Sequence, residues 1–333
     1  MHSASVDLGF HGDQEEGTRL NFAVNVRGLT PPAGLRAALE EELTTLGAYP
    51  SAARKEAIAA ELARRNGVSV ERIVLLSGAA EGFTIIAHLG WRDALVLHPG
   101  FTEPEQALRQ AGVPVTRVVM EPPFSALPAR TADLERPAHF GVVGCPINPT
   151  GTVVSPSLSA EFLLVDEAFA DVADIGVNNV ARPNTFVTRS LTKTWNLAGL
   201  RCGYMIIPEG FKDKVEAFRP HWALGSLQLA AFEWVLESGD TEAIKREIAA
   251  ERAEMVELLA TAGFTIATKS VAPYLLVKPP GDAEPLRRHL AEQGIAVRRC
   301  DTFPGLDSSY WRLAVRPADD VRELIREVKA CQR

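Results

Sequence analysis

A lysine at position 193 lies in a segment whose residue types suit covalent chemistry with an aldehyde. The segment from Arg189 to Tyr204 reads RSLTKTWNLAGLRCGY. A lysine amine forms a Schiff base with a carbonyl compound, while Ser190 and Arg201 offer a hydroxyl and a guanidinium to a phosphate. Together they indicate a site for a phosphorylated aldehyde cofactor such as pyridoxal phosphate. The alternative is that Lys193 is an ordinary surface lysine, as most lysines are.

A turn of small residues near position 78 is a candidate phosphate site. Gly78, Ala79 and Ala80 stand between an apolar run that predicts a strand and a run that predicts a helix. Backbone N–H groups and the positive end of the dipole at a helix start attract an anion. Small side chains let that anion approach the backbone. Taken alone, the pattern is also that of an ordinary turn.

Two polar residues follow apolar runs that predict strands. Asn148 stands in CPINPTG and Asp166 directly follows Leu163–Val165. Ligands of α/β sheets bind at the carboxyl ends of the strands. A buried unpaired aspartate is costly, so Asp166 indicates a cationic partner such as a protonated pyridine nitrogen. The alternatives are a plain turn at Asn148 and a helix cap at Asp166.

An arginine interrupts a late apolar run. Arg312 lies in YWRLAVR, and a guanidinium in such a strand favours a bidentate carboxylate partner, which an amino-acid substrate carries. A structural salt bridge is the alternative.

The elements that must position these residues alternate between helix and strand from about residue 35. Helical apolar spacing covers 35–46 and 54–66, and Gly67 is the predicted C-cap of the second helix. Short, continuously apolar runs predict strands buried on both faces, as in a mostly parallel sheet between helices. These runs are 73–76, 94–97, 115–119, 140–144, 162–165, 185–188 and 204–207.

The pattern changes after about residue 208 and predicts a smaller α+β domain. Helices are predicted at 211–218, 227–236, 242–262, 284–293 and 319–330, and strands at 264–267, 274–277, 296–299 and 311–315. The predicted organisation is an N-terminal arm (1–34), a large cofactor-binding domain (35–210) and a small C-terminal domain (211–333).

Composition restricts the function classes. The chain of 333 residues has a formal net charge of −7, which disfavours general nucleic-acid binding. No apolar run reaches the roughly 20 residues of a membrane-spanning helix, and the N-terminus lacks the pattern of a secretory signal. The four cysteines form no C-x-x-C pair and the histidines no metal-ligand spacing. We therefore expect a cytoplasmic protein with reduced cysteines and no metal, membrane or nucleic-acid partner.

The order of these motifs resembles fold-type I pyridoxal phosphate enzymes, specifically the branch of histidinol-phosphate aminotransferases and the threonine-phosphate decarboxylases of cobalamin biosynthesis. The resemblance covers nearly the whole chain, and the segment around Lys193, with Asp166 upstream, is its most specific part. It implies pyridoxal 5'-phosphate as cofactor, a seven-stranded sheet in the large domain and a homodimer with shared active sites.

The resemblance also implies a role for each motif residue. Lys193 would form the Schiff base and move the proton at the substrate α-carbon, and Asp166 would pair with the pyridine nitrogen. Asn148 would bind the phenolic oxygen of the ring, and Arg312 and Asn25 would contact the substrate. The cofactor phosphate would be held by a set made up of Gly78, Ala79, Ala80, Ser190, Arg201 and, from the neighbouring subunit, Tyr49. His11-Gly12 resembles the start seen in the cobalamin branch.

Several positions depart from the family pattern. Pro104 replaces a tyrosine that stacks on the pyridine ring, so Phe101 or another residue must cover it. Phe169 replaces a tyrosine of many aminotransferases and is familiar from the decarboxylases. The Asn-Pro motif of the arm is here Val26-Arg27-Gly28, and the connection 151–162 is short enough to be a bare loop.

Other residues have structural expectations. Of the five tryptophans, Trp222 is the one expected to line the cleft, and the others are expected to serve in packing. Arg298, Arg299 and Arg316 are expected on the surface, although one of them is a candidate for a phosphate on the substrate.

The expected function is a pyridoxal phosphate-dependent aminotransferase for a small, phosphorylated amino acid or amine, linked to cobalamin biosynthesis. If Arg312 holds the carboxylate in the plane of the ring, the Cα–H bond is perpendicular and transamination follows; if the carboxylate turns out of the plane, CO₂ leaves. Decarboxylation of threonine phosphate is therefore the first alternative. The loss of the aromatic residue at Pro104 motivates a second, a non-catalytic pyridoxal phosphate-binding regulator or scaffold.

Overall fold

A seven-stranded mixed sheet forms the centre of the computed structural model, which describes residues 8–9, 18–128 and 136–332. Its strand order is β2-β8-β7-β6-β5-β3-β4, and β8 is antiparallel to both neighbours while the other pairs are parallel. The bounds are β2 Ile73–Leu76, β3 Ala94–His98, β4 Val115–Val119, β5 Ala138–Gly144, β6 Ala160–Asp166, β7 Thr185–Ser190 and β8 Gly203–Ile206. The prediction of a mostly parallel seven-stranded sheet is confirmed.

The sheet is covered on both faces, as its continuously apolar strands predicted. Successive residues of β2 point to opposite faces, so Leu75 packs in one core and Val74 and Leu76 in the other. The first core includes residues of α1 (Ala33–Glu42), α2 (Ala52–Asn66) and α6 (Ser226–Ser238). The second includes residues of α3 (Ala79–Ala87), α4 (Glu103–Gln110) and α5 (Lys212–Glu216).

The sequence predicted one connection of the sheet correctly and missed one helix. The loop 151–159 between the parallel strands β5 and β6 contains no helix, in agreement with its short length. The helix α4 was not predicted; it has Pro104 in its first turn, where a missing N–H removes no helical hydrogen bond.

The remaining strands lie in the C-terminal part. An antiparallel sheet has the order β12-β13-β10-β9, and a parallel pair joins β1 near the N-terminus to β11. These strands are β1 Leu20–Asn21, β9 Thr265–Ile266, β10 Tyr274–Lys278, β11 Ile295–Ala296, β12 Arg298–Arg299 and β13 Trp311–Ala314. Helices α7 (Thr241–Thr261), α8 (Ala283–Glu292) and α9 (Ala318–Cys331) complete this part.

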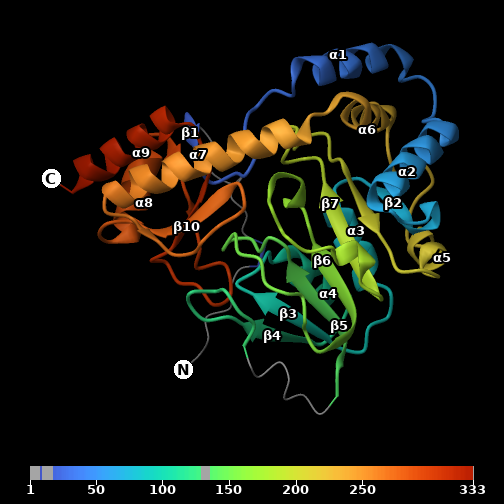
Figure 1. Cartoon of the computed structure of the whole chain (residues 1–333), viewed down its shortest axis with the longest axis horizontal. Coiled ribbons are helices and arrows are strands. Elements are labelled where there is room, and N and C mark those ends of the chain that lie inside the picture. Colours follow the sequence, from blue (N-terminus) through green and yellow to red (C-terminus); the bar gives the residue numbers. More distant parts are fainter. Residues whose placement is uncertain (1–7, 10–17, 129–135, 333) are drawn as a thin grey trace.

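The helix α7 crosses the molecule from the region of α1 and α6 to the side of α9 (Figure 1). The helix α6 packs against α1 and α2 and contributes Leu229, Ala231 and Phe232 to the core of the main sheet. The division into 1–34, 35–210 and 211–333 stays a prediction.

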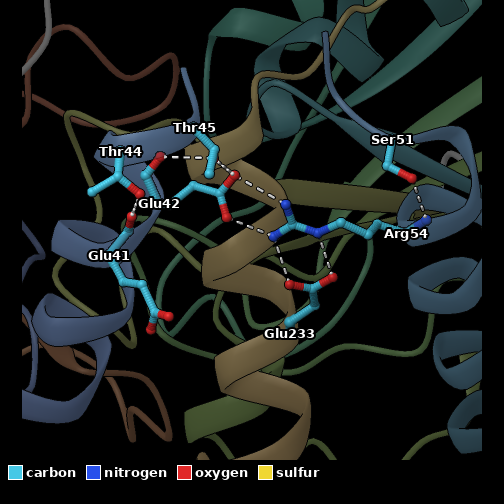
Figure 2. A network of polar contacts seen from close by, with 7 residues as sticks. All are labelled: Glu41, Glu42, Thr44, Thr45, Ser51, Arg54 and Glu233. Atoms are coloured by element: carbon cyan, nitrogen blue, oxygen red, sulfur yellow. Dashed lines mark hydrogen bonds and ion pairs between the residues drawn. The ribbon is translucent and has the colours of Figure 1, made fainter. Parts of the chain in front are cut away.

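A polar network ties three helices together (Figure 2). Arg54 of α2 makes hydrogen bonds of 2.7 and 2.9 Å to Glu233 of α6, and of 2.9 and 3.0 Å to Glu42 at the end of α1. Both carboxylates are held bidentately, which fixes their orientation. The hydrogen bond from Arg54 lowers the pKa of Glu42.

Replacing Arg54 with methionine is expected to lower the free energy of unfolding by about 1–2 kcal/mol at low salt, and less at high salt, because the network is partly exposed and screened. The matched control is Arg64→Met, since Arg64 makes a bidentate pair with Glu61 within the same helix. That variant should lose less than about 0.5 kcal/mol. Urea unfolding at two salt concentrations measures both, and equal losses would contradict a role in joining the helices.

Candidate active site

The predicted site residues meet at one edge of the main sheet. Strands β5, β6 and β7 are parallel, so their carboxyl ends place Asn148, Asp166 and Ser190 side by side. Because β8 runs in the opposite direction, Arg201 reaches the same edge from the residues that precede that strand. Lys193 follows β7 there. The chain therefore concentrates its chemistry where open α/β sheets bind ligands.

A cavity of about 540 Å³ opens at this edge. Nine of the eleven predicted site residues line it: Asn25, Ala79, Ala80, Asn148, Asp166, Ser190, Lys193, Arg201 and Arg312. Sequence reasoning missed Phe83 and Glu103 and identified no role for Thr192 or Ala23, which also line it. The position of Glu103, a few residues beyond the end of β3, is the signal that could have identified it.

One end of the cavity suits a phosphate. The helix α3 begins after Gly78 without a side-chain cap, so its first N–H groups are open to a ligand. Gly78 has φ +82°, and a Cβ there would lie 2.8 Å from Nη2 of Arg201. A Cβ on Gly203 would lie 3.0 Å from the backbone nitrogen of Ala79. Both glycines thus allow the helix start and the guanidinium to come close together.

Asp166, at the end of β6, lines the cavity and is largely shielded from solvent. Its Oδ1 accepts hydrogen bonds from the Thr188 hydroxyl at 3.0 Å and from the Ala168 N–H at 3.2 Å. Burial raises the pKa of Asp166 to about 6, although these two hydrogen bonds oppose the rise. A cation placed beside this carboxylate would remove the cost of ionising it.

In the cofactor-free protein, Asp166 is expected to reduce stability as the pH rises from about 4 to 6. Its folded-state pKa lies above the ordinary value of 3.8, so the native state binds the proton more tightly than the unfolded state does. Stability is therefore greatest below pH 4 and the loss is complete above pH 6, by about 3 kcal/mol for a pKa difference of about two.

Urea unfolding of the wild type and of Asp166→Asn between pH 4.5 and 7.5 measures this effect. The asparagine variant should lack that part of the decline with pH. Identical pH dependence in the two proteins would show that Asp166 does not titrate as described.

Two further guanidinium groups line the cavity. Arg312 of β13 donates to Oδ1 of Asn148 at 2.9 Å and to the carbonyl oxygen of Ala23. Arg298 of β12 is the direct strand partner of Arg312 and lines the same cavity. Burial, followed by the charge of Arg298, lowers the pKa of Arg312 to about 10, so the group stays cationic at neutral pH.

Two buried polar atoms of lining residues lack a partner among the described residues. They are Nε of Arg312 and Oδ1 of Asn25. A buried polar group without a hydrogen bond is costly. Both atoms belong to side chains that line the cavity, so a polar ligand would satisfy them.

Aromatic side chains cover the apolar walls. Pro104 is buried in α4 and does not line the cavity, whereas Phe101 and Phe83 do, with ring centroids 6.2 Å apart. Phe169 also lines it and packs edge-on against Tyr274 at 5.0 Å. Phe101 is thus available to cover a bound ring where the family tyrosine is missing.

A buried ionic cluster anchors α4, next to the cavity. Nε2 of His98, at the end of β3, lies 2.7 Å from Glu105 of α4, whose carboxylate also pairs with Arg109 and Arg117. The hydrogen bonds from these three groups lower the pKa of Glu105 to about 2 against the opposing effect of burial. The cluster holds the segment with Phe101 and Glu103 at the cavity wall.

Two predicted residues lie apart from the cavity or at its margin. Gly78 supports the phosphate end without lining it, and Tyr49 is 76% exposed and stacks on Trp222 with centroids 4.4 Å apart. The expectation that Trp222 lines the cleft is wrong: it is not among the lining residues and is 61% exposed, on a surface loop where its ring contacts those of Tyr49 and His221.

The expectation that Arg298 and Arg316 lie on the surface is also wrong. They are 4% and 9% exposed, because Arg298 points into the cavity and Arg316 binds the carbonyl oxygens of Asn21 and Val24. Arg299 is half-buried and pairs with Asp301. The predicted His11-Gly12 motif lies outside the described residues.

The residues of the cavity fit pyridoxal 5'-phosphate. The uncapped start of α3, Ser190 and Arg201 would hold the phosphate, and buried Asp166 would pair with a protonated ring nitrogen. Lys193 supplies the amine that a carbonyl group requires. The raised pKa of Asp166 is an independent indication, since it marks a carboxyl that requires a cation.

Known proteins show the same fold and related sequences. The model of the aminotransferase class I and II family matches residues 18–328. A histidinol-phosphate aminotransferase of Mycobacterium tuberculosis is 39% identical over 323 residues, which cover 92% of this chain and 87% of the relative. A threonine-phosphate decarboxylase of Salmonella typhimurium is 29% identical, covering 99% and 94%.

A solved structure has the same fold. The histidinol-phosphate aminotransferase of Sinorhizobium meliloti in complex with pyridoxal-5'-phosphate superposes with a TM-score of 0.81 at 19% identity, covering 94% of this chain and 91% of that one.

The fold and the cavity define an enzyme of the fold-type I class that uses pyridoxal 5'-phosphate. The chain belongs to the aminotransferase class I and II family. The predicted family, fold class and cofactor are confirmed. No helix among the described residues has the length and apolar character required to cross a membrane.

Proposed function

We propose that the protein is an aminotransferase for a small amino acid or amine that carries a phosphate. The observation that carries this proposal is the pair of buried guanidiniums of Arg298 and Arg312, which lie on adjacent strands and both line the cavity. The Nε of Arg312 is buried without a partner among the described residues, and a guanidinium favours carboxylate and phosphate partners, so this part of the cavity favours a substrate with anionic groups. Relatives named for histidinol phosphate and threonine phosphate support a phosphorylated substrate.

In this proposal, each side chain of the site has its own role in the reaction. Pyridoxal phosphate, when bound, withdraws electrons from the bonds at the substrate α-carbon. Lys193 takes the proton from that carbon and returns it to the product, while Asp166 keeps the ring nitrogen protonated. Arg312 fixes the carboxylate or phosphate and so selects the bond to be broken, with Asn148 held by Arg312 through Oδ1. Asn148 can then donate from its amide nitrogen to the cofactor.

Decarboxylation of a phosphorylated amino acid is the second candidate. Phe169 occupies the position where many aminotransferases have tyrosine, and the relative named threonine-phosphate decarboxylase aligns with 99% of the chain. This reaction would use the same site, and it would differ in which bond at the α-carbon Arg312 positions for cleavage. A link to cobalamin biosynthesis is part of this proposal, supported by the names of such relatives.

One experiment separates the two reactions. The holoenzyme is incubated with threonine phosphate, and separately with histidinol phosphate plus 2-oxoglutarate, and CO₂ and glutamate are assayed. Glutamate without CO₂ supports the aminotransferase, CO₂ without glutamate supports the decarboxylase, and neither product from any phosphorylated amine would refute the proposal.

Arg298 is expected to act on the phosphate of the substrate. Arg298→Gln should lower kcat/KM for the phosphorylated substrate roughly 100-fold, because a charged hydrogen-bonding group is lost from a buried site. The same substrate without its phosphate is the control, and its kcat/KM should change less than about threefold. Equal losses for both substrates would exclude this role.

A homodimer is also part of the proposal. Tyr49 and Trp222 form an exposed stacked pair, and Leu43 and Leu46 nearby in the chain are each more than half exposed. Such an apolar group favours an interface in which Tyr49 reaches the cofactor phosphate of the partner. Sedimentation of the wild type and of a Tyr49→Ala variant, together with the cofactor affinity of each, tests this proposal.

A cytoplasmic location is proposed because Cys145, Cys202 and Cys300 are buried free thiols.

A further inference from the structure

The side chain of Asn196 bridges the turn that contains Lys193 and residues 23–30 of the predicted N-terminal arm. Residues 23–30 are called the arm from here on. Its Oδ1 accepts from the Gly28 N–H at 3.0 Å, and its Nδ2 donates to the Thr30 carbonyl oxygen at 3.0 Å. Asn196 stands three residues after Lys193 and has φ +57°, a conformation that asparagine adopts more readily than most residues. One amide group thus joins two segments more than 160 residues apart.

The arm carries substrate-facing residues at its other end. Ala23, Val24 and Asn25 line the cavity, and Oδ1 of Asn25 is buried there with no hydrogen-bond partner in the described part of the chain. Arg316 holds this end through the carbonyl oxygens of Asn21 and Val24, at 2.9 and 2.8 Å. The arm therefore passes from the C-terminal part, across the cavity, to the turn that contains Lys193.

Little else fastens the arm where it meets the lysine turn. Gly28, Leu29 and Thr30 are exposed, and Leu29 is exposed completely. Arg27 is tied away from the turn, to Glu247 at 3.0 Å and Glu251 at 3.2 Å of α7. Within the described residues of one subunit, Gly28, Leu29 and Thr30 are not buried by apolar packing, so the two hydrogen bonds of Asn196 join the arm to the turn.

We propose that Asn196 is a positioning residue that holds the arm, and with it Asn25, over the substrate next to Lys193. This inference rests on the proposed function, because it requires an amino substrate in the cavity. Asn196 is not among the residues that line the cavity, so it acts through the arm. Its loss should therefore weaken substrate binding while the chemical step at Lys193 is kept.

The central variant is Asn196→Gly, which retains the left-handed backbone and removes both hydrogen bonds. KM for the amino substrate should rise roughly tenfold with kcat changed less than about twofold, the pattern expected when an interaction equal in the ground and transition states is lost. The cofactor affinity and its visible spectrum should be unchanged. The matched control is Asn184→Gly, since Asn184 is an exposed asparagine with φ +52° outside the cavity; it should behave as wild type.

A second variant perturbs the bridge from the arm. A Cβ on Gly28 would lie 3.2 Å from Nδ2 of Asn196, tighter than ordinary contact. Gly28→Ala should therefore raise KM alone, yet add little to Asn196→Gly, in which the crowded amide is gone. If the two changes raise KM multiplicatively, the proposed role of the Asn196 bridge is wrong. An unchanged KM in Asn196→Gly, or a parallel loss of kcat and cofactor affinity, would also refute this role.

Hydrogen exchange separates failure of this inference from failure of the proposed function. Backbone amides 23–31 of the holoenzyme should exchange faster in Asn196→Gly than in wild type and Asn184→Gly, whether or not any substrate is turned over. An inactive wild type with this exchange difference would refute the proposed function alone. Unchanged exchange would refute the bridge, even with an active enzyme.

Discussion

The Lys193→Ala variant is expected to lose transamination by about 10⁴-fold or more in kcat, because the residue that moves the proton at the substrate carbon is removed. Among the described residues that line the cavity, there is no second lysine. No neighbouring amine can therefore replace that of Lys193. The cofactor should still bind through Arg201, Ser190 and the start of α3, but without the covalent link.

Two measurements check this result. Single-turnover kinetics gives the rate, and the visible absorption band of the lysine-linked cofactor should be replaced by that of free pyridoxal phosphate. The control is Lys269→Ala, an exposed lysine away from the cavity, which should keep both activity and spectrum. A Lys193→Ala protein with the wild-type spectrum would place the covalent link elsewhere.

The Arg312→Gln variant is expected to lower kcat/KM by roughly 10²- to 10³-fold, because it removes the cation that anchors the anionic group of the substrate. Its effect on the free enzyme should be small. The buried guanidinium has a pKa lowered to about 10 by burial and by Arg298, and its Nε has no partner among the described residues. Loss of that unfavourable charge offsets the lost hydrogen bonds to Asn148 and Ala23.

Steady-state kinetics and thermal unfolding separate these effects. The expected result is a large loss of kcat/KM with the unfolding midpoint and the cofactor spectrum close to wild type. The comparison variant is Arg316→Gln, another buried arginine, which binds only backbone carbonyl oxygens of the described chain. It should lose stability, since three carbonyl groups lose a donor, and its loss of kcat/KM should be much smaller, because Arg316 acts on the substrate only through the arm that it holds. A matching pattern in both variants would show that Arg312 is structural.

The elements of the main sheet could be predicted because their signals are local. Continuously apolar runs such as 73–76 and 185–188 require burial on both faces, and the structure has β2 and β7 there. Gly67 ends α2 in the left-handed conformation that glycine favours. The exception, α4, has buried glutamate and proline in its first turns, and its cluster of His98, Glu105 and Arg117 depends on partners distant in sequence.

Part of the candidate site could be predicted for a similar reason. Asn148, Asp166 and Ser190 each follow an apolar strand, and parallel strands end at one edge. The burial of Arg298 and the exposure of Trp222 could not be predicted, since both depend on long-range packing. Arg298 looks like a surface residue in sequence, and only its pairing across β13 brings it beside Arg312.

The sequence by itself determined the cofactor chemistry, because Lys193, Asp166 and the turn at Gly78 are recognisable from residue types and their order along the chain. Only the tertiary structure decided which side chains surround the substrate. Three features depend on segments that are far apart in the chain. They are the position of Arg298 in the cavity, the position of Phe101 on the cavity wall and the hydrogen bond between Asn196 and Gly28. Covalent and phosphate chemistry needs particular side chains, whereas a binding surface needs particular distances, and folding alone sets those.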